Sequence, residues 1–116
     1  MNKRDCVLYV DIKMSEEDIL DLIHKKYGGK RSYYYVDCNW AIFDIESNDA
    51  YSWIKKRRKD DGFLYFKYMI AVESKIEESF NLFVSNLRDF IAILKQKGGQ
   101  VVPACDFEDE LNTTGR

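Results

Sequence analysis

The chain has 116 residues, of which 18 are basic and 20 acidic, so its formal net charge is −2. Its 46% apolar and 15% aromatic residues are typical of one packed domain spanning residues 1–116, and they exclude a disordered or low-complexity chain. A charge this close to zero favours neither nucleic acid nor a membrane surface as a partner of the whole molecule.

The first part of the chain is expected to form a strand, a helix and a second strand. The alternation from Cys6 to Lys13 predicts a strand with Cys6, Leu8, Val10 and Ile12 on its inner face. Ser15 fits a helix N-cap, because acidic residues fill the turn after it, and the helix is expected to end at Gly28-Gly29. The aromatic and β-branched segment from Tyr33 to Glu46 predicts one long second strand, bulged near Asn39.

A polar connection from Ser47 to Gly62 follows, and it carries the basic run Lys55 to Lys59. Two aspartates, Asp60 and Asp61, stand directly after this run. A solvated hairpin loop is the simplest interpretation. The alternatives are a nucleic-acid patch and internal pairing with the acidic tail, residues 106–116.

The rest of the chain predicts a strand, a long helix and a short strand. The third strand is expected from Gly62 to Val72, and a capping box at Ser74 to Glu77 is expected to begin the second helix. Apolar residues then recur at helical spacing up to Leu94. Val101 to Cys105 predicts a fourth strand at a sheet edge, because Pro103 cannot donate to a strand ladder.

The order strand, helix, strand, strand, helix, strand predicts an α+β fold. With right-handed crossovers it gives a ferredoxin-like two-layer sandwich (βαββαβ), in which two helices cover one face of a four-stranded antiparallel sheet. The other face would then be open. It is expected to expose Tyr9, Phe63, Tyr65 and Met69, and an apolar patch of this kind marks a partner surface, unless loops or a second copy of the chain in a homodimer cover it.

Two segments resemble the motifs of RNA-recognition domains. Leu8-Tyr9-Val10 is similar to the opening of the shorter motif, and Gly62-Phe63-Leu64-Tyr65-Phe66-Lys67-Tyr68 is similar to much of the longer one. The resemblance implies that Tyr9, Phe63 and Tyr65 would stack bases, which makes RNA binding on the sheet face the alternative function.

The end of the chain, residues 106–116, is an acidic tail. Asp106, Glu108, Asp109 and Glu110 place four carboxylates within five positions. These carboxylates are either a solvated terminus, contacts for a basic partner, or, less in keeping with their spacing, a divalent-metal site.

No residue pattern indicates catalysis. The single histidine, His24, lies at the edge of the first helix's apolar stripe and has no obvious partner. No Ser-His-Asp or Cys-His arrangement is credible, and no phosphate-binding glycine motif occurs. The three cysteines, Cys6, Cys38 and Cys105, are widely spaced and are expected to be reduced thiols. We therefore expect no enzyme activity, no cofactor and no bound metal.

The segment from Gly62 to Leu111 resembles small bacterial immunity proteins of contact-dependent and related toxin systems. The resemblance rests on Phe63 to Tyr68, on the long amphipathic helix, and on the sequence Ala104 to Leu111. It implies a cytoplasmic inhibitor that occludes a cognate toxin domain, often a nuclease. Tyr9, Phe63, Tyr65 and Met69 would then be apolar anchors, and Asp106, Glu108, Asp109 and Glu110 charge contacts. Nucleic acid is not the expected partner, and no transmembrane segment is expected.

Overall fold

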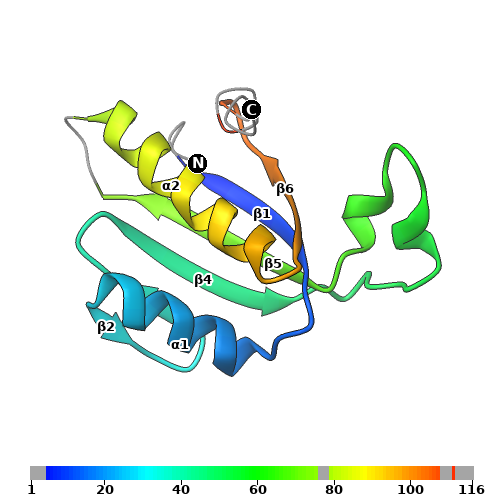
Figure 1. Ribbon diagram of the computed structural model, residues 1–116, viewed down its shortest axis with the longest axis horizontal. Helices are drawn as coiled ribbons and strands as arrows, with labels where there is room; N and C mark the ends of the chain where they lie inside the picture. Colours follow the sequence, from blue (N-terminus) through cyan, green and yellow to red (C-terminus); the bar gives the residue numbers. More distant parts are fainter. Residues whose placement is uncertain (1–4, 76–78, 108–110, 112–116) are drawn as a thin grey trace.

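The computed structural model describes residues 5–75, 79–107 and 111. These residues form an α+β structure whose elements are, in order, β1 (Cys6–Asp11), α1 (Glu16–Tyr27), β2 (Lys30–Arg31), β3 (Tyr35–Asp37), β4 (Ala41–Ser47), β5 (Tyr68–Ser74), α2 (Phe80–Gln96) and β6 (Gln100–Ala104) (Figure 1). Two short 3-10 helices, η1 (Lys55–Arg57) and η2 (Gly62–Tyr65), lie between β4 and β5.

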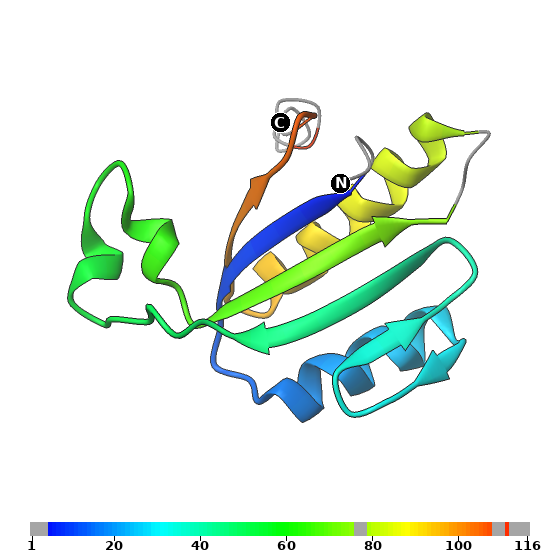
Figure 2. The same cartoon turned by 180° about the vertical axis from the view of Figure 1, so that it is seen from behind.

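Both helices lie on the same face of the sheet, as the front and back views agree (Figures 1 and 2). The cause is the alternation of the strands, since every second residue is buried, and the residues between are not, along β1, from Ala41 to Ile45 in β4 and from Tyr68 to Val72 in β5. The inward residues pack with the buried stripes of α1 and α2 into one core. The expectation of two helices on one sheet face is therefore confirmed.

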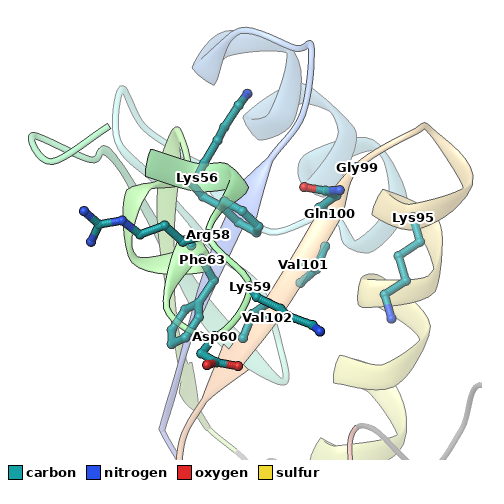
Figure 3. A pocket seen from close by; sticks show the side chains of 12 residues that line it. Lys56, Arg58, Lys59, Asp60, Phe63, Lys95, Gly99, Gln100, Val101 and Val102 are labelled. Carbon is teal, nitrogen blue, oxygen red and sulfur yellow. The ribbon is translucent and has the colours of Figure 1, made fainter. Parts of the chain in front are cut away.

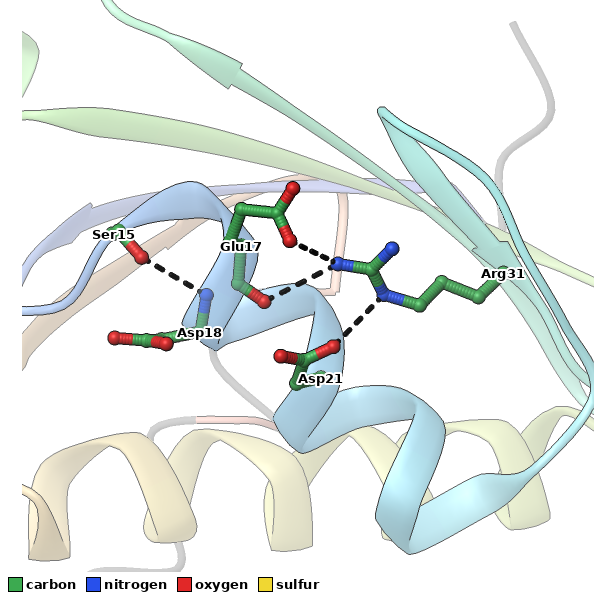
Figure 4. A network of polar contacts seen from close by, with 5 residues as sticks. All are labelled: Ser15, Glu17, Asp18, Asp21 and Arg31. Atoms are coloured by element: carbon green, nitrogen blue, oxygen red, sulfur yellow. Dashed lines mark hydrogen bonds and ion pairs between the residues drawn. The ribbon is translucent and has the colours of Figure 1, made fainter.

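The helix α1 begins and ends where the sequence predicts. The Ser15 hydroxyl accepts a hydrogen bond from the Asp18 amide at 3.1 Å, and Gly28 ends the helix with a φ of 74°. Arg31 then ties β2 to α1, because its guanidinium pairs with Glu17 at 2.9 Å and Asp21 at 3.1 Å (Figure 4).

The sheet has six strands, in the order β2-β3-β4-β5-β1-β6, where four were expected. The single strand expected from Tyr33 to Glu46 is wrong. The chain reverses at Cys38–Ala41, where the Cys38 amide donates to the Ala41 carbonyl at 3.0 Å, so β3 and β4 pair as a hairpin. Exposed Asn39 suits this turn, and Trp40 points into the core beside it. The hairpin and β2 add two strands at one edge.

The third strand also begins later than expected, because β5 starts at Tyr68 and Gly62–Tyr65 is a 3-10 helix. The Asn48 side-chain amide donates to the carbonyls of Leu64 and Phe66, at 2.9 and 2.8 Å, and holds this segment in a folded-back path. Gly62 is buried, and a Cβ there would lie 2.5 Å from the Lys56 carbonyl oxygen. Residues 48–67, which we call the lobe, project from one end of the sheet (Figures 1 and 2).

The second helix is capped by Ser79, not by Ser74. The Ser79 hydroxyl accepts from the Leu82 amide at 3.2 Å, whereas Ser74 is the last residue of β5. Glu77 of the expected capping box lies outside the described residues. The prediction of an edge strand is confirmed, since β6 contains Pro103 and ends the sheet.

An aromatic cluster fills the space between the helices and β4. Phe43 is fully buried there, with its ring centroid 5.0 Å from that of Phe90 and 5.8 Å from that of Tyr27. Trp40 joins the same cluster against Phe43 and Phe83. Aromatic pairs of this geometry each add roughly 0.5–1.5 kcal/mol beyond their buried area, so this cluster is a main source of core stability.

Candidate partner-binding face

The face of the sheet opposite the helices is open over most of its area (Figure 2). The outward residues of β1, β5 and β6 are largely apolar and half-buried or exposed. They are Val7, Tyr9, Met69, Ala71, Val102 and Ala104. We call these residues, with the outward residues of β4, the sheet face. The strand register places Met69 beside Tyr9, and Val102 on the other side of Tyr9, so they form one continuous apolar strip.

Carboxylates border this strip along β4 and β5. Glu46 stands opposite Met69, Asp44 stands opposite Ala71, and Glu73 stands opposite Ile42. All three acids are exposed, and within residues 5–75, 79–107 and 111 none of them forms an ion pair. The sheet face thus combines an apolar centre with carboxylates that no described cation pairs with.

These acids are not among the site residues expected from the sequence. The signal was present in the segment Ala41–Ser47, where Ala41, Phe43 and Ile45 are buried and Asp44 and Glu46 alternate with them. The error was to treat residues Tyr33 to Glu46 as one strand, since this left the outward side of β4 unexamined.

Only two of the four expected apolar anchors lie on the sheet face. Tyr9 and Met69 do, but Phe63 and Tyr65 belong to η2 in the lobe, so their assignment to an outward strand face is wrong. The Phe63 ring packs edge-on against Tyr9, with ring centroids 5.3 Å apart. The chain's own lobe therefore covers one end of the apolar strip.

Tyr65 is occupied by neighbours in the lobe. The Lys55 ammonium lies 5.4 Å and the Arg58 guanidinium 5.5 Å from its ring centroid. Both distances fit cation–π contacts. Tyr65 is therefore a support for the basic run and is not an anchor of the sheet face.

The acidic tail is only partly described. Asp106 is exposed, whereas Glu108, Asp109 and Glu110 lie outside the described residues. Phe107 and Leu111 are buried, and Phe107 packs against Phe80 and Phe83 of α2 with ring centroids 5.1 and 5.9 Å away. The tail is thus anchored to the core at both of these residues. Asp106 directly precedes the contact that Phe107 makes with α2.

Comparisons with known proteins add no relative. No protein-family model, curated protein or solved structure matched this chain significantly. The function must therefore be argued from the geometry.

Two further observations concern the described part of the chain. It contains no group of three or more His, Cys, Asp or Glu side chains that could hold a metal ion. None of its helices is long and apolar enough to cross a membrane.

Two cysteines, Cys6 and Cys105, lie side by side where β1 pairs with the edge strand β6. The sulfur of Cys6, just inside β1, is 2.7 Å from the sulfur of Cys105, just after β6. Cys38 is remote from this pair, and its thiol donates to the Ala41 carbonyl at 3.3 Å. None of the three cysteines is in a disulfide.

Proposed function

We propose that the sheet face binds a basic protein partner, and that this partner is a cognate bacterial toxin domain which the chain neutralises by occlusion in the cytoplasm. The observation that carries the proposal is the group of carboxylates Asp44, Glu46 and Glu73, which form no ion pair with any described residue, beside the apolar strip of Tyr9 and Met69. The resemblance of residues 62–111 to immunity proteins supports the choice of a toxin.

The two parts of the sheet face would have different roles in such a complex. The apolar strip supplies contact area, with Tyr9 and Met69 belonging to residue types that are enriched at interface cores. The acids at its border would attract a positively charged surface, which speeds association and fixes orientation. Nuclease domains carry basic clefts because their substrate is a polyanion, so a nuclease toxin fits this face best.

The same charges weigh against RNA binding on the sheet face. A phosphate backbone laid over Tyr9 would pass beside Glu46 and Asp44, whose carboxylates would repel it. Phe63 packs on Tyr9 and Tyr65 is flanked by Lys55 and Arg58, so the three expected stacking residues do not lie side by side on a strand surface.

The strand order also supports a more specific description of the fold. Four adjacent strands run β4-β5-β1-β6 to one edge of the sheet, and each pairs antiparallel with its neighbours. We propose that they form a ferredoxin-like core with α1 and α2, extended at one edge by β2 and β3.

Co-expression tests the proposed function. The product of the gene immediately upstream should co-purify with this chain, and the chain should rescue cells that express that product. Met69→Glu should abolish both effects, because it places a charge in the apolar strip. The matched control is Leu82→Glu, since Leu82 is an exposed apolar residue on α2 in the helical layer.

Three results would contradict the proposal. These are an absent complex with the upstream product, full rescue by the Met69→Glu variant, or equal loss with Leu82→Glu. Sedimentation of the chain alone tests the alternative that the sheet face forms a homodimer. A wild-type dimer that dissociates in the Met69→Glu variant would assign the sheet face to a second copy of the chain.

A further inference from the structure

The lobe concentrates positive charge in a chain that is acidic elsewhere. Residues 48–67 contain six Lys or Arg and three Asp, whereas the rest of the chain contains twelve Lys or Arg and seventeen Asp or Glu. The lobe stands clear of the two layers at one end of the sheet (Figures 1 and 2). Its field is therefore presented to solvent as a separate basic surface.

Exposed aromatic rings are interleaved with these cations. The Arg57 guanidinium lies 5.3 Å from the centre of the Trp53 ring, and the Lys56 ammonium lies 5.4 Å from that of Tyr51. Trp53 is 58% exposed and Tyr51 is 43% exposed, so each ring keeps surface for a ligand. Large exposed rings beside cations indicate a surface for ligands that carry both flat aromatic rings and anionic groups.

A groove of about 800 Å³ runs between the lobe, β6 and the end of α2. Lys59 extends toward it from the lobe and Lys95 from α2 (Figure 3). Phe63 of the lobe and Val102 of β6 also line it. Asp60 is the acid that lines it. A second hollow shares Lys56 and Gln100 with this groove. Its other lining residues include Tyr51, Arg57, Lys13, Lys67 and Lys97.

The lobe is tied firmly enough to the sheet to hold these groups in place. Lys56 donates to the Asp11 carboxylate of β1 at 2.8 Å, and Phe63 packs on Tyr9. Among the described residues, Lys56 thus pairs with Asp11 and Arg58 pairs with Asp61 at 3.6 Å. No ion pair in that part of the chain engages Arg57, Lys59 or Lys95.

We propose that the lobe and its groove bind single-stranded nucleic acid. Phosphates would lie along Arg57, Lys59 and Lys95, and unpaired bases would stack on Trp53 and Tyr51. A paired duplex would offer phosphates but would hide the ring faces of its bases. The carboxylates of the sheet face would repel the strand from that face and direct it to the lobe.

This inference is independent of the proposed function, because it uses a different surface and a ligand of opposite charge. Fluorescence anisotropy tests it, with labelled single-stranded DNA and RNA of mixed sequence and about 20 nucleotides, a length that exceeds typical site sizes. With the three phosphate contacts at Arg57, Lys59 and Lys95 the affinity should fall roughly twentyfold between about 50 and 200 mM salt.

The fluorescence of the two tryptophans reports directly on base stacking. Trp53 is exposed in the lobe and Trp40 is 5% exposed in the core, so a bound oligonucleotide should quench only Trp53. Trp53→Ala should remove the quenching and weaken binding by about tenfold, the effect of losing one base stack. Circular dichroism should show the fold of this variant unchanged, because the ring is at the surface.

Charge reversal supplies the matched comparison. Arg57→Glu with Lys59→Glu should reduce affinity by more than about thirtyfold at low salt. Lys25→Glu with Lys30→Glu, at exposed positions on α1 and β2, should leave it unchanged. The proposal is overturned by absent binding at low salt, by equal loss in the two double variants, by binding without Trp53 quenching, or by binding to phosphatidylserine vesicles alone.

Discussion

The rings of Tyr9 on β1 and Phe63 in the lobe meet edge to face, with centroids 5.3 Å apart and planes at 76°. This pair joins the two surfaces of the molecule. It ends the apolar strip of the sheet face and also anchors the basic lobe. The docking of the lobe on the sheet therefore decides how far each surface extends.

Phe63→Ala should loosen this docking. The variant loses an aromatic pair and part of a half-buried ring, so the free energy of unfolding should fall by roughly 1–2 kcal/mol. Hydrogen exchange should show faster exchange in residues 48–67 and little change in β4. Leu64→Ala is the control, because the side chain of Leu64 is next to Phe63 in sequence but exposed. Its truncation should lower the free energy of unfolding much less. Equal effects of the two variants would argue against the Tyr9 contact as the anchor.

The ion pair between Lys56 and Asp11 should make lobe docking sensitive to alkaline pH. The hydrogen bond to the Asp11 carboxylate raises the pKa of Lys56 above its ordinary value of 10.5. A raised pKa means that the folded state holds this proton more tightly than the unfolded state. The stabilisation is therefore complete below about pH 10.5 and is lost as pH rises through the folded pKa.

Lys56→Met tests that expectation. The alkaline increase of hydrogen exchange in the lobe should be present in the wild type and absent in the variant, whose lobe should already exchange faster at neutral pH. An identical alkaline profile in both proteins would show that the pair does not hold the lobe.

Tyr27→Phe should be neutral or stabilising by up to about 1 kcal/mol in urea unfolding. The Tyr27 hydroxyl oxygen is buried, and among the described residues it has no hydrogen-bond partner. Burial, with smaller contributions from Asp89 and Cys38, raises the pKa of Tyr27 well above 10.0. The wild type should thus lose stability above about pH 10, as the unfolded chain loses its proton first, and the variant should lose less. A marked loss of stability in the variant at neutral pH would indicate that the hydroxyl has a partner.

Cys6 and Cys105 should form a cross-strand disulfide under mild oxidation. Their sulfurs are 2.7 Å apart, and the β1–β6 register continues directly to these two residues. Diamide should remove two hydrogens from the mass of the protein, and the product should be more stable by roughly 2–4 kcal/mol. Cys38→Ser should keep this reaction and Cys105→Ser should abolish it. Intermolecular products alone would contradict the expected pairing.

The elements that the sequence predicts well are those with local signals. Ser15 and Gly28 bound α1 through their own caps, and Pro103 places β6 at an edge, so short-range chemistry decided each of them. The start of β5 could not be found in this way. The segment Gly62–Tyr65 has a strand-like composition, but the distant Asn48 side chain holds it in a 3-10 helix.

Only part of the candidate site could be predicted from the sequence. The open face and its residues Tyr9 and Met69 follow from strand alternation, which the structure retains. The acids Asp44 and Glu46 were missed because the reversal at Cys38–Ala41 is made by an Asn-Trp pair, a much weaker turn signal than Asn-Gly.

The most direct test of the account is the affinity of this chain for the product of the neighbouring gene, measured by calorimetry with charge-reversed variants. Glu46→Lys with Glu73→Lys should weaken the complex by more than about tenfold and reduce its salt dependence. Asp89→Lys, at an exposed position on α2, should bind like the wild type. Unchanged affinity in the sheet-face variant, together with a loss in Asp89→Lys, would move the binding surface to the helices and contradict the account.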